Sequence, residues 1–217
     1  MAEAGAALTF RVAAPLKLQV RFGCLGDAAM SGRHAAGGVV TPSNPQLCGN
    51  KSGWWGFTGV ANADGALRER AGAGLEAECD ALPAAAAGGV KLLPSTVRAT
   101  GAHGLRATAV LHALGPSSFH ARESEAGLGR TYDACLRLAD ELHLPSLALP
   151  ALCCGVAGFP AAVGARAALD AVDRHCAAAA AAGVGGGTLA RLEFVLLERR
   201  VFNAFADAAH ERWGRST

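Results

Sequence analysis

The stretch LALPALCCGVAGFP, residues 147–160, decides the fold class of this chain. Its first six residues are almost all apolar, which is typical of a parallel strand that is covered on both faces of a sheet. Two glycines then permit a tight turn, and Pro160 favours the start of a helix. Pro150 removes one hydrogen-bond donor from the strand, so we expect an edge position or a bulge there. The stretch therefore predicts a strand-loop-helix unit.

Similar patterns occur on both sides of this unit. Apolar runs bounded by turn residues predict strands over 8–12, 16–22, 38–40, 96–100, 107–114, 147–152 and 189–197. Helical periodicity predicts one helix from Asp64, as N-cap, to Pro83, and others over 124–142, 161–182 and 201–213. Because strands alternate with helices, we expect an α/β fold with helices on both faces of an open sheet. The 217 residues are expected to form one domain, residues 1–217.

The composition excludes several classes of protein. The formal charge is +2 and no block of Lys or Arg occurs, so binding of duplex nucleic acid is not expected. Seven cysteines without a CxxC pair favour a reduced, intracellular compartment, cytoplasm or nucleus, and indicate no metal site. The N-terminus does not resemble a secretory signal, and no apolar run is long enough to span a membrane. No motif calls for a cofactor.

The loop over residues 153–159 has the features of an anion site. Backbone N–H groups at a helix N-terminus, together with the positive end of the helix dipole, favour a phosphate. In open α/β sheets, ligands bind beyond the carboxyl ends of the strands, where this loop lies. The alternative is a plain strand-to-helix turn that needs glycine for a positive φ.

Four segments occur in a particular order: VVTPSNPQLCGN (39–50), ADGALRERAGAGLEAEC (63–79), HALGP (112–116) and LALPALCCGVAGFP (147–160). In order and nearly in spacing they resemble the strand-loop motifs of the macro domain family, from about Gly26 to the C-terminal helix. The resemblance implies a three-layer α/β/α fold with a mixed central sheet and a cleft that binds ADP-ribose. The motif-bearing core would span about 16–213, with a long inserted loop over 50–63.

The resemblance implies roles for two short loops. Gly26-Asp27-Ala28 would end the second strand as a turn and contact adenine, with Asp27 accepting a hydrogen bond from the adenine amino group. The alternative for Asp27 is a turn residue that bonds its own backbone. Asn44 matches the asparagine that binds the distal ribose hydroxyls, a role that suits an amide because it both donates and accepts. Thr41 stands where the family usually has another asparagine.

Asp64-Gly65 matches the aspartate-glycine pair of the family's hydrolytic branch. There the carboxylate activates or orients the attacking water, so the resemblance implies that Asp64 is catalytic and that Asn44 assists. Gly65 would lie against the ligand. The alternative role of Asp64, an N-cap of the following helix, is compatible with this one.

The resemblance also implies that the glycine-punctuated loop holds the diphosphate. Its expected ligand-binding residues are Cys153, Cys154, Gly155, Val156, Ala157, Gly158 and Phe159. A cysteine facing a helix N-terminus could instead act as a nucleophile, but relatives have small residues there, which let the backbone approach phosphate. Leu197 takes the place of an adenine-stacking aromatic, with Phe202 as a less favoured substitute. We interpret His112 as a structural histidine.

The segment between Gly49 and Asp64 departs most from the family pattern. It replaces a compact glycine run and carries Trp54 and Trp55, whereas the diphosphate loop has Ala157 where the family often has Tyr or Phe. We hypothesise that one of these tryptophans covers the distal ribose. The alternative is that both anchor the long loop.

Two functions follow from the resemblance. The first is hydrolysis of an ester or phosphate at the distal ribose, in a mono-ADP-ribosylated protein, O-acetyl-ADP-ribose or ADP-ribose-1''-phosphate. The second is a reader that binds ADP-ribose or ADP-ribosylated proteins without turnover. The sequence leaves both open.

Overall fold

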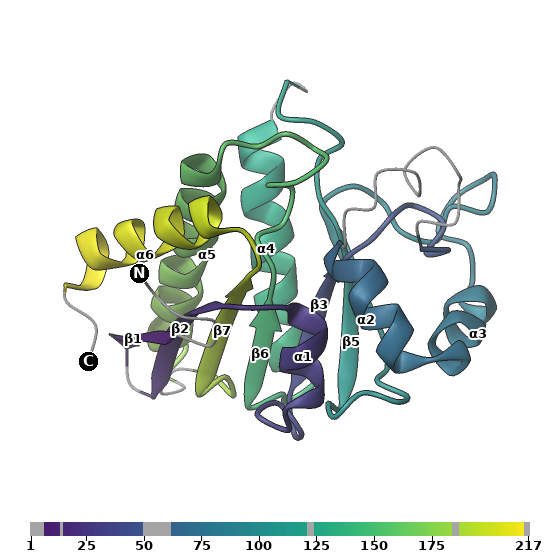
Figure 1. Ribbon diagram of the computed structural model, residues 1–217, viewed down its shortest axis with the longest axis horizontal. Helices are drawn as coiled ribbons and strands as arrows, with labels where there is room; N and C mark the ends of the chain where they lie inside the picture. The colour runs from purple at the N-terminus through teal and green to yellow at the C-terminus, as the bar shows by residue number, and fades with distance from the viewer. Residues whose placement is uncertain (1–6, 14, 50–61, 121–123, 184–186, 215–217) are drawn as a thin grey trace.

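One mixed sheet forms the centre of the molecule (Figure 1). The computed structural model describes residues 7–13, 15–49, 62–120, 124–183 and 187–214. Within these ranges the strand order is β1-β2-β7-β6-β3-β5-β4. The strands are β1 (Ala7–Ala13), β2 (Leu16–Phe22), β3 (Gly38–Pro42), β4 (Thr96–Gly101), β5 (Ala109–Leu114), β6 (Ser146–Leu149) and β7 (Arg191–Leu196). The outer strands β1 and β4 run antiparallel to their neighbours, and the inner five are parallel.

Helices cover both faces of this sheet, as Figure 1 shows. On one face lie α1 (Leu25–Met30), α2 (Ala63–Ala71) and α3 (Ala73–Ala81). On the other lie α4 (Ser124–Glu141), α5 (Ala161–Ala181) and α6 (Arg199–Trp213). The strands serve both layers because successive side chains point to opposite faces: Val39 packs toward α2 and α3, and Val40 packs toward α4 and α5. The predicted three-layer α/β/α fold with a mixed sheet is confirmed.

The strand that opens the deciding stretch is shorter than predicted. β6 ends at Leu149, so Pro150 lies outside the hydrogen-bonded ladder and removes no donor from it. β6 is also central, between β7 and β3, and all four of its residues are buried. The expected edge position or bulge at Pro150 is therefore wrong, because the strand stops one residue before the proline. β3, in contrast, continues to Pro42, two residues beyond the predicted end.

The helix predicted from Asp64 to Pro83 is in fact two helices. Its N-cap is Asn62, whose side chain accepts a hydrogen bond from the Gly65 amide, so Asp64 lies inside the first turn. Gly72 separates α2 from α3 because its φ of 77° is not helical. The apolar stripe that carried the prediction, Leu67, Ala71, Leu75 and Cys79, is buried as expected.

A short helix replaces the turn expected at Gly26-Asp27. α1 begins at Leu25 and packs closely on α2: a Cβ at Gly26 would lie 2.8 Å from the Ala66 carbonyl oxygen. Most of the inserted loop, residues 50–61, lies outside the described residues, and Trp54 and Trp55 with it. Among the helices of the described ranges, none has the length and apolar character needed to cross a membrane.

Candidate functional site

Several of the predicted site residues that the structure describes follow strands at one edge of the sheet. Because β2, β7, β6, β3 and β5 are parallel, their carboxyl ends share an edge, and the loops that follow β5 and β6 lie along it (Figure 1). These loops carry the 115–120 segment and the 150–160 segment. The loop after β3 carries Asn44, and α1 with Asp27 follows β2. This is the edge at which open α/β sheets bind ligands.

The glycine-punctuated loop after β6 has backbone amides that are free to bind a ligand. Its turn is closed by hydrogen bonds from the Gly158 amide to Gly155 O (2.9 Å) and from the Phe159 amide to Cys153 O (3.1 Å). Within the described part of the chain, the amides of Gly155, Val156 and Ala157 donate to no protein acceptor. Helix α5 begins directly after the loop, without a side-chain cap. Three free N–H groups beside an uncapped helix N-terminus make a favourable environment for a phosphate.

Neighbouring elements hold this loop in place. The Leu152 amide donates to the Tyr132 hydroxyl of α4 (2.8 Å), and the Phe119 amide donates to Ala157 O (2.9 Å). The Phe159 side chain is 3% exposed and packs edge-on against Phe119, with ring centroids 5.4 Å apart. The side chain of Phe159 thus belongs to the core, whereas Val156 is 74% exposed.

The two cysteines of the loop point into tight packing. A Cβ at Gly115 would lie 2.3 Å from the Cys153 sulfur, and one at Gly164 would lie 2.2 Å from the Cys154 sulfur. Burial raises the pKa of Cys153 to about 12 and that of Cys154 to about 11. Both thiols therefore stay protonated at neutral pH, which argues against the nucleophile alternative because the thiolate is the reactive form.

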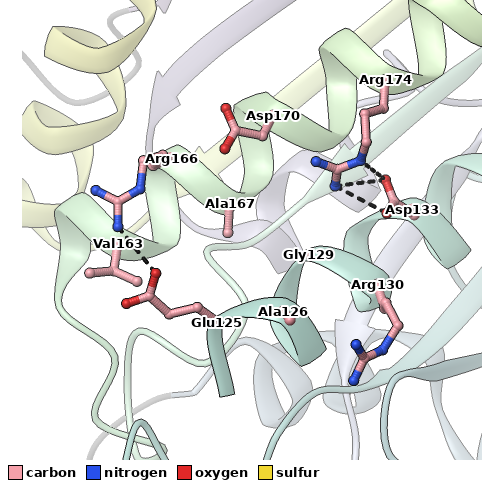
Figure 2. Close-up of a pocket in the computed structure, with 10 residues that line it drawn as sticks. All are labelled: Glu125, Ala126, Gly129, Arg130, Asp133, Val163, Arg166, Ala167, Asp170 and Arg174. Atoms are coloured by element: carbon pink, nitrogen blue, oxygen red, sulfur yellow. Dashed lines mark hydrogen bonds and ion pairs between the residues drawn. The ribbon is translucent and has the colours of Figure 1, made fainter. Parts of the chain in front are cut away.

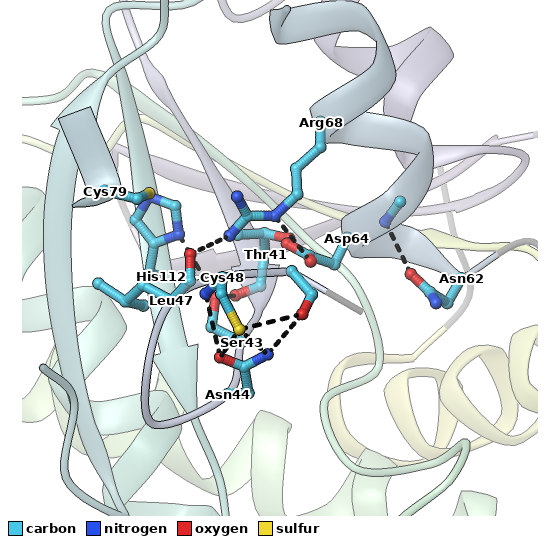
Figure 3. A network of polar contacts seen from close by, with 12 residues as sticks. Thr41, Ser43, Asn44, Leu47, Cys48, Asn62, Asp64, Arg68, Cys79 and His112 are labelled. Atoms are coloured by element: carbon cyan, nitrogen blue, oxygen red, sulfur yellow. Dashed lines mark hydrogen bonds and ion pairs between the residues drawn. The ribbon is translucent and has the colours of Figure 1, made fainter. Parts of the chain in front are cut away.

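Asn44 closes its own loop in this structure (Figure 3). Its Nδ2 donates to Gly49 O (2.8 Å), and its Oδ1 accepts from the Cys48 amide (3.2 Å). The loop needs two residues with positive φ, Leu47 at 59° and Gly49 at 66°. Leu47 is fully buried and anchors the turn. The predicted contact of Asn44 with ribose would have to replace or share these internal hydrogen bonds.

Asp64 lies at the centre of a buried polar network, shown in Figure 3. It is 7% exposed, and both carboxylate oxygens accept hydrogen bonds at 2.9 Å, Oδ1 from Thr41 Oγ1 and Oδ2 from Arg68 Nε. Burial raises the pKa of Asp64, while the charge of Arg68 and the hydrogen bonds from Thr41 and Arg68 lower it in part. Thr41, fully buried in β3, therefore has a defined role as a donor to this carboxylate.

His112 lies beside this network and is neutral. It is fully buried in β5 and hydrogen-bonds through Nε2 to Thr100 Oγ1 at 2.9 Å. Burial and the charge of Arg68 lower its pKa to about 4. The interpretation of His112 as a structural histidine agrees with these contacts.

The predicted adenine residues are only partly accessible. Asp27 has a side chain 70% exposed and pairs with Arg70 Nη2 at 2.5 Å, whereas Ala28 is buried. Leu197 is 54% exposed just beyond β7. Phe202 is 5% exposed and packs against Phe22, as expected of a core residue.

Arg199 and Phe22 were not anticipated from the sequence. The Arg199 guanidinium lies 4.0 Å from the centre of the Phe22 ring, at the carboxyl end of β2. A flat cation on an aromatic face offers a second planar surface near Leu197. Arg68 is the other functional candidate that sequence reasoning missed, although its i,i+4 spacing from Asp64 was a visible signal.

A separate groove of about 360 Å³ lies between α4 and α5 (Figure 2). Four of its charged side chains form two ion pairs, Arg166 with Glu125 at 3.2 Å and Arg174 with Asp133 at 3.0 Å. Among the residues that the structure describes, none of the predicted site residues lines it. The carboxyl edge of the sheet is therefore the better candidate site. Across the described ranges, no group of three or more His, Cys, Asp or Glu side chains is arranged to hold a metal ion.

The fold and this edge are those of open α/β proteins that bind ligands beyond the carboxyl ends of their strands, and comparison with known proteins identifies the family. The model of the Macro domain family matches residues 50–168, more than half of the chain. A macro domain-containing protein of Streptomyces coelicolor is 34% identical over 176 residues, which cover 80% of this chain and 90% of that protein. The chain belongs to the macro domain family.

Other relatives match the chain with lower coverage or lower sequence identity. A macro domain-containing protein of Xanthomonas axonopodis is 35% identical over 103 residues, and the chain spans 57% of its length. An O-acetyl-ADP-ribose deacetylase of Pantoea vagans is 32% identical over 145 residues, which cover 66% of this chain and 77% of that enzyme. A solved macrodomain of Oceanobacillus iheyensis with ADP superposes with a TM-score of 0.77 at 19% identity, over 96% of this chain and 97% of that one. This likeness establishes the fold.

Proposed function

We propose that this chain binds ADP-ribose and hydrolyses a linkage at its distal ribose. The scissile bond would be an ester to a protein side chain, an acetyl ester, or a terminal phosphate. The observation that carries the proposal is a buried carboxylate, Asp64, hydrogen-bonded to Thr41 near the carboxyl end of β3, while a loop with three free amides follows β6, the strand next to β3. The similarity to the Pantoea vagans deacetylase supports the choice of a hydrolase.

The diphosphate would occupy the loop after β6. Its charge would be met by the amides of Gly155, Val156 and Ala157 and by the N-terminus of α5. Adenine would lie toward Asp27 and Leu197, and the distal ribose toward Asn44 and Gly65. These placements follow from the family resemblance together with the positions of the loops.

Asp64 would act as the general base for water. A buried carboxylate with a raised pKa is a stronger base than an exposed one, yet Arg68 and Thr41 favour its ionised form. A carboxylate has about four lone-pair sites, and Arg68 and Thr41 use two of them. The remaining sites are free to orient a water beside the ribose.

A second candidate function is a reader that binds ADP-ribose or ADP-ribosylated proteins without turnover. Two observations favour it: both Asp64 oxygens already accept internal hydrogen bonds, and the Asn44 side chain closes its own loop. A site whose polar groups are satisfied internally can bind a ligand through backbone amides alone.

One experiment separates the two functions. Calorimetry with ADP-ribose measures binding, and release from O-acetyl-ADP-ribose and from a mono-ADP-ribosylated protein measures turnover. We expect both from the intact chain, and loss of turnover with retained binding from Asp64→Ala. Glu69→Ala is the matched control, because that carboxylate lies on the same helix and is 82% exposed. Binding without turnover in the intact chain would establish the reader, and turnover that survives Asp64→Ala would remove Asp64 from the reaction.

A further inference from the structure

Arg68 connects the predicted catalytic carboxylate, Asp64, with the loop that carries the predicted ribose-binding residue, Asn44. Its Nε donates to Asp64 Oδ2 at 2.9 Å, and its Nη2 donates to Leu47 O at 3.0 Å (Figure 3). Leu47 belongs to the loop that carries Asn44. One guanidinium therefore bridges the carboxylate on α2 and the loop that follows β3.

The structure is shaped around this side chain. Arg68 is 9% exposed although it carries a charge, and such a cation is retained only where partners compensate its burial. A Cβ at Gly49 would lie 3.0 Å from both Cδ and Nε of Arg68. Gly49 also has a φ of 66°. A glycine there therefore permits the backbone turn and leaves room for the Arg68 side chain.

Arg68 is also the charge that acts on Asp64. The charge of Arg68 acts on two further titratable side chains, Cys79 on α3 and His112 on β5, and the charge of Glu78 on α3 acts on both of these. Burial raises the pKa of the Cys79 thiol, and burial and Arg68 lower the pKa of His112 to about 4, so both are neutral at pH 7. Among the described residues, Arg68 alone lowers the pKa of Asp64 by its charge.

We propose that Arg68 is a positioning residue with two duties: it keeps the Asp64 carboxylate ionised, and it fixes the Asn44 loop against α2. The inference rests on the proposed function for its link to turnover. The two duties need different features of the side chain. Ionisation of Asp64 needs only a positive charge, whereas the bridge to Leu47 O needs the forked guanidinium, whose donors point in fixed directions.

Two substitutions separate these duties. Arg68→Gln removes the charge and the fork, and Arg68→Lys keeps the charge but removes the fork. Arg137→Gln is the matched control, because this arginine is 71% exposed on α4 and loses the same charge far from the site. The carboxyl carbon of Asp64 is followed by ¹³C NMR as the pH is varied, with Asp64→Asn to assign its signal. ADP-ribose affinity is measured by calorimetry, and turnover of O-acetyl-ADP-ribose is measured against pH.

In Arg68→Gln we expect Asp64 to titrate at higher pH than in the intact chain, and the acid limb of kcat to move up with it. Turnover should be lost at the acid end of the profile and recover as the pH is raised, because the base is active only when ionised. In Arg68→Lys the titration of Asp64 and the acid limb should return toward those of the intact chain, while ADP-ribose affinity stays lower. A purely structural arginine would lower activity at every pH without moving the limb.

Each duty has its own refutation. An Asp64 titration that is unchanged in Arg68→Gln overturns the first, and full ADP-ribose affinity in Arg68→Lys overturns the second. If Arg68→Gln does not fold, the lysine variant still tests both, since its Asp64 must titrate near the value of the intact chain. NMR and calorimetry need no turnover, so they test the inference about Arg68 even in a chain that does not hydrolyse ADP-ribose derivatives. Binding without hydrolysis would overturn the proposed reaction and would not affect these two tests.

Discussion

Replacing Glu193 with glutamine should destabilise the protein at neutral pH and progressively less in acid. Glu193 is fully buried in β7 and meets three basic side chains: it accepts hydrogen bonds from Arg21 Nε and, at 3.4 Å, from Arg33 Nε, and it lies 2.7 Å from His34 Nε2. Burial by itself raises its pKa, but His34, Arg21 and Arg33 together lower it from 4.5 to about 2. At about 1.4 kcal/mol per pKa unit, ionised Glu193 contributes about 3 kcal/mol at pH 7.

The sign of the pH dependence follows from the lowered pKa. Because the folded state binds the Glu193 proton less tightly than the unfolded chain, this stability is complete above the unfolded pKa of 4.5 and is lost as the pH falls toward 2. At pH 3 about 1.4 kcal/mol of it should remain. Glu193→Gln resembles the protonated form, so the gap between the intact chain and this variant should shrink over the same range.

Urea unfolding at pH 7, 5, 4 and 3 measures this gap. Glu141→Gln is the matched control, since Glu141 is 59% exposed and pairs with an exposed arginine; we expect a change within about 0.5 kcal/mol there. A free energy of unfolding that is unchanged at pH 7 in Glu193→Gln would refute the ionic account of this cluster. A loss of the same size at every pH would show that packing, and not ionisation, matters.

Three further predictions concern residues around the site. His112 has a pKa of about 4 in the folded protein, below 6.5, so stability should fall by about 3 kcal/mol as the pH drops from 6.5 to 4, and His112→Gln should flatten that part of the curve in thermal or urea unfolding. Gly164→Ala places a Cβ 2.2 Å from the Cys154 sulfur and should lower the free energy of unfolding by about 1–3 kcal/mol. The double variant with Cys154→Ala should recover most of this loss, and no recovery would mean that the sulfur is not the obstacle. Tyr132→Phe removes the acceptor of the Leu152 amide and should cost about 1–3 kcal/mol, with faster amide hydrogen exchange at Leu152; unchanged exchange would count against this hydrogen bond.

The sequence was most informative where one physical cause determines the structure. The apolar run before the glycines predicted β6, since a strand with helices on both sides favours apolar side chains, as at Leu147, Ala148 and Leu149. Ser146, the fourth buried residue of β6, is polar and has a hydrogen-bond partner in His34. It could not locate the end of that strand, because Pro150 is compatible with a bulge or with a stop. The prediction of one helix over 64–83 was wrong for a similar reason, because an isolated glycine such as Gly72 is compatible with a helical pattern. The break is visible in the folded structure, where Gly72 has a φ of 77° and Ala71 O accepts a hydrogen bond from the Gly104 amide.

The candidate site was less predictable because its polar residues depend on distant partners. Asp64 and Arg68 are four residues apart, a spacing that usually indicates a solvated pair worth a few tenths of a kcal/mol. Here the loop after β3 covers the pair. It can do so because the Leu47 side chain is buried and anchors the loop, and because Gly49 has no side chain to collide with Arg68. Thr41 stands where the family usually has an asparagine, and its hydroxyl donates from β3 to Asp64 Oδ1 on α2. Burial turns an ordinary surface ion pair into an element that controls a carboxylate. That change arises from packing between segments more than 20 residues apart, and for this reason no local pattern reports it.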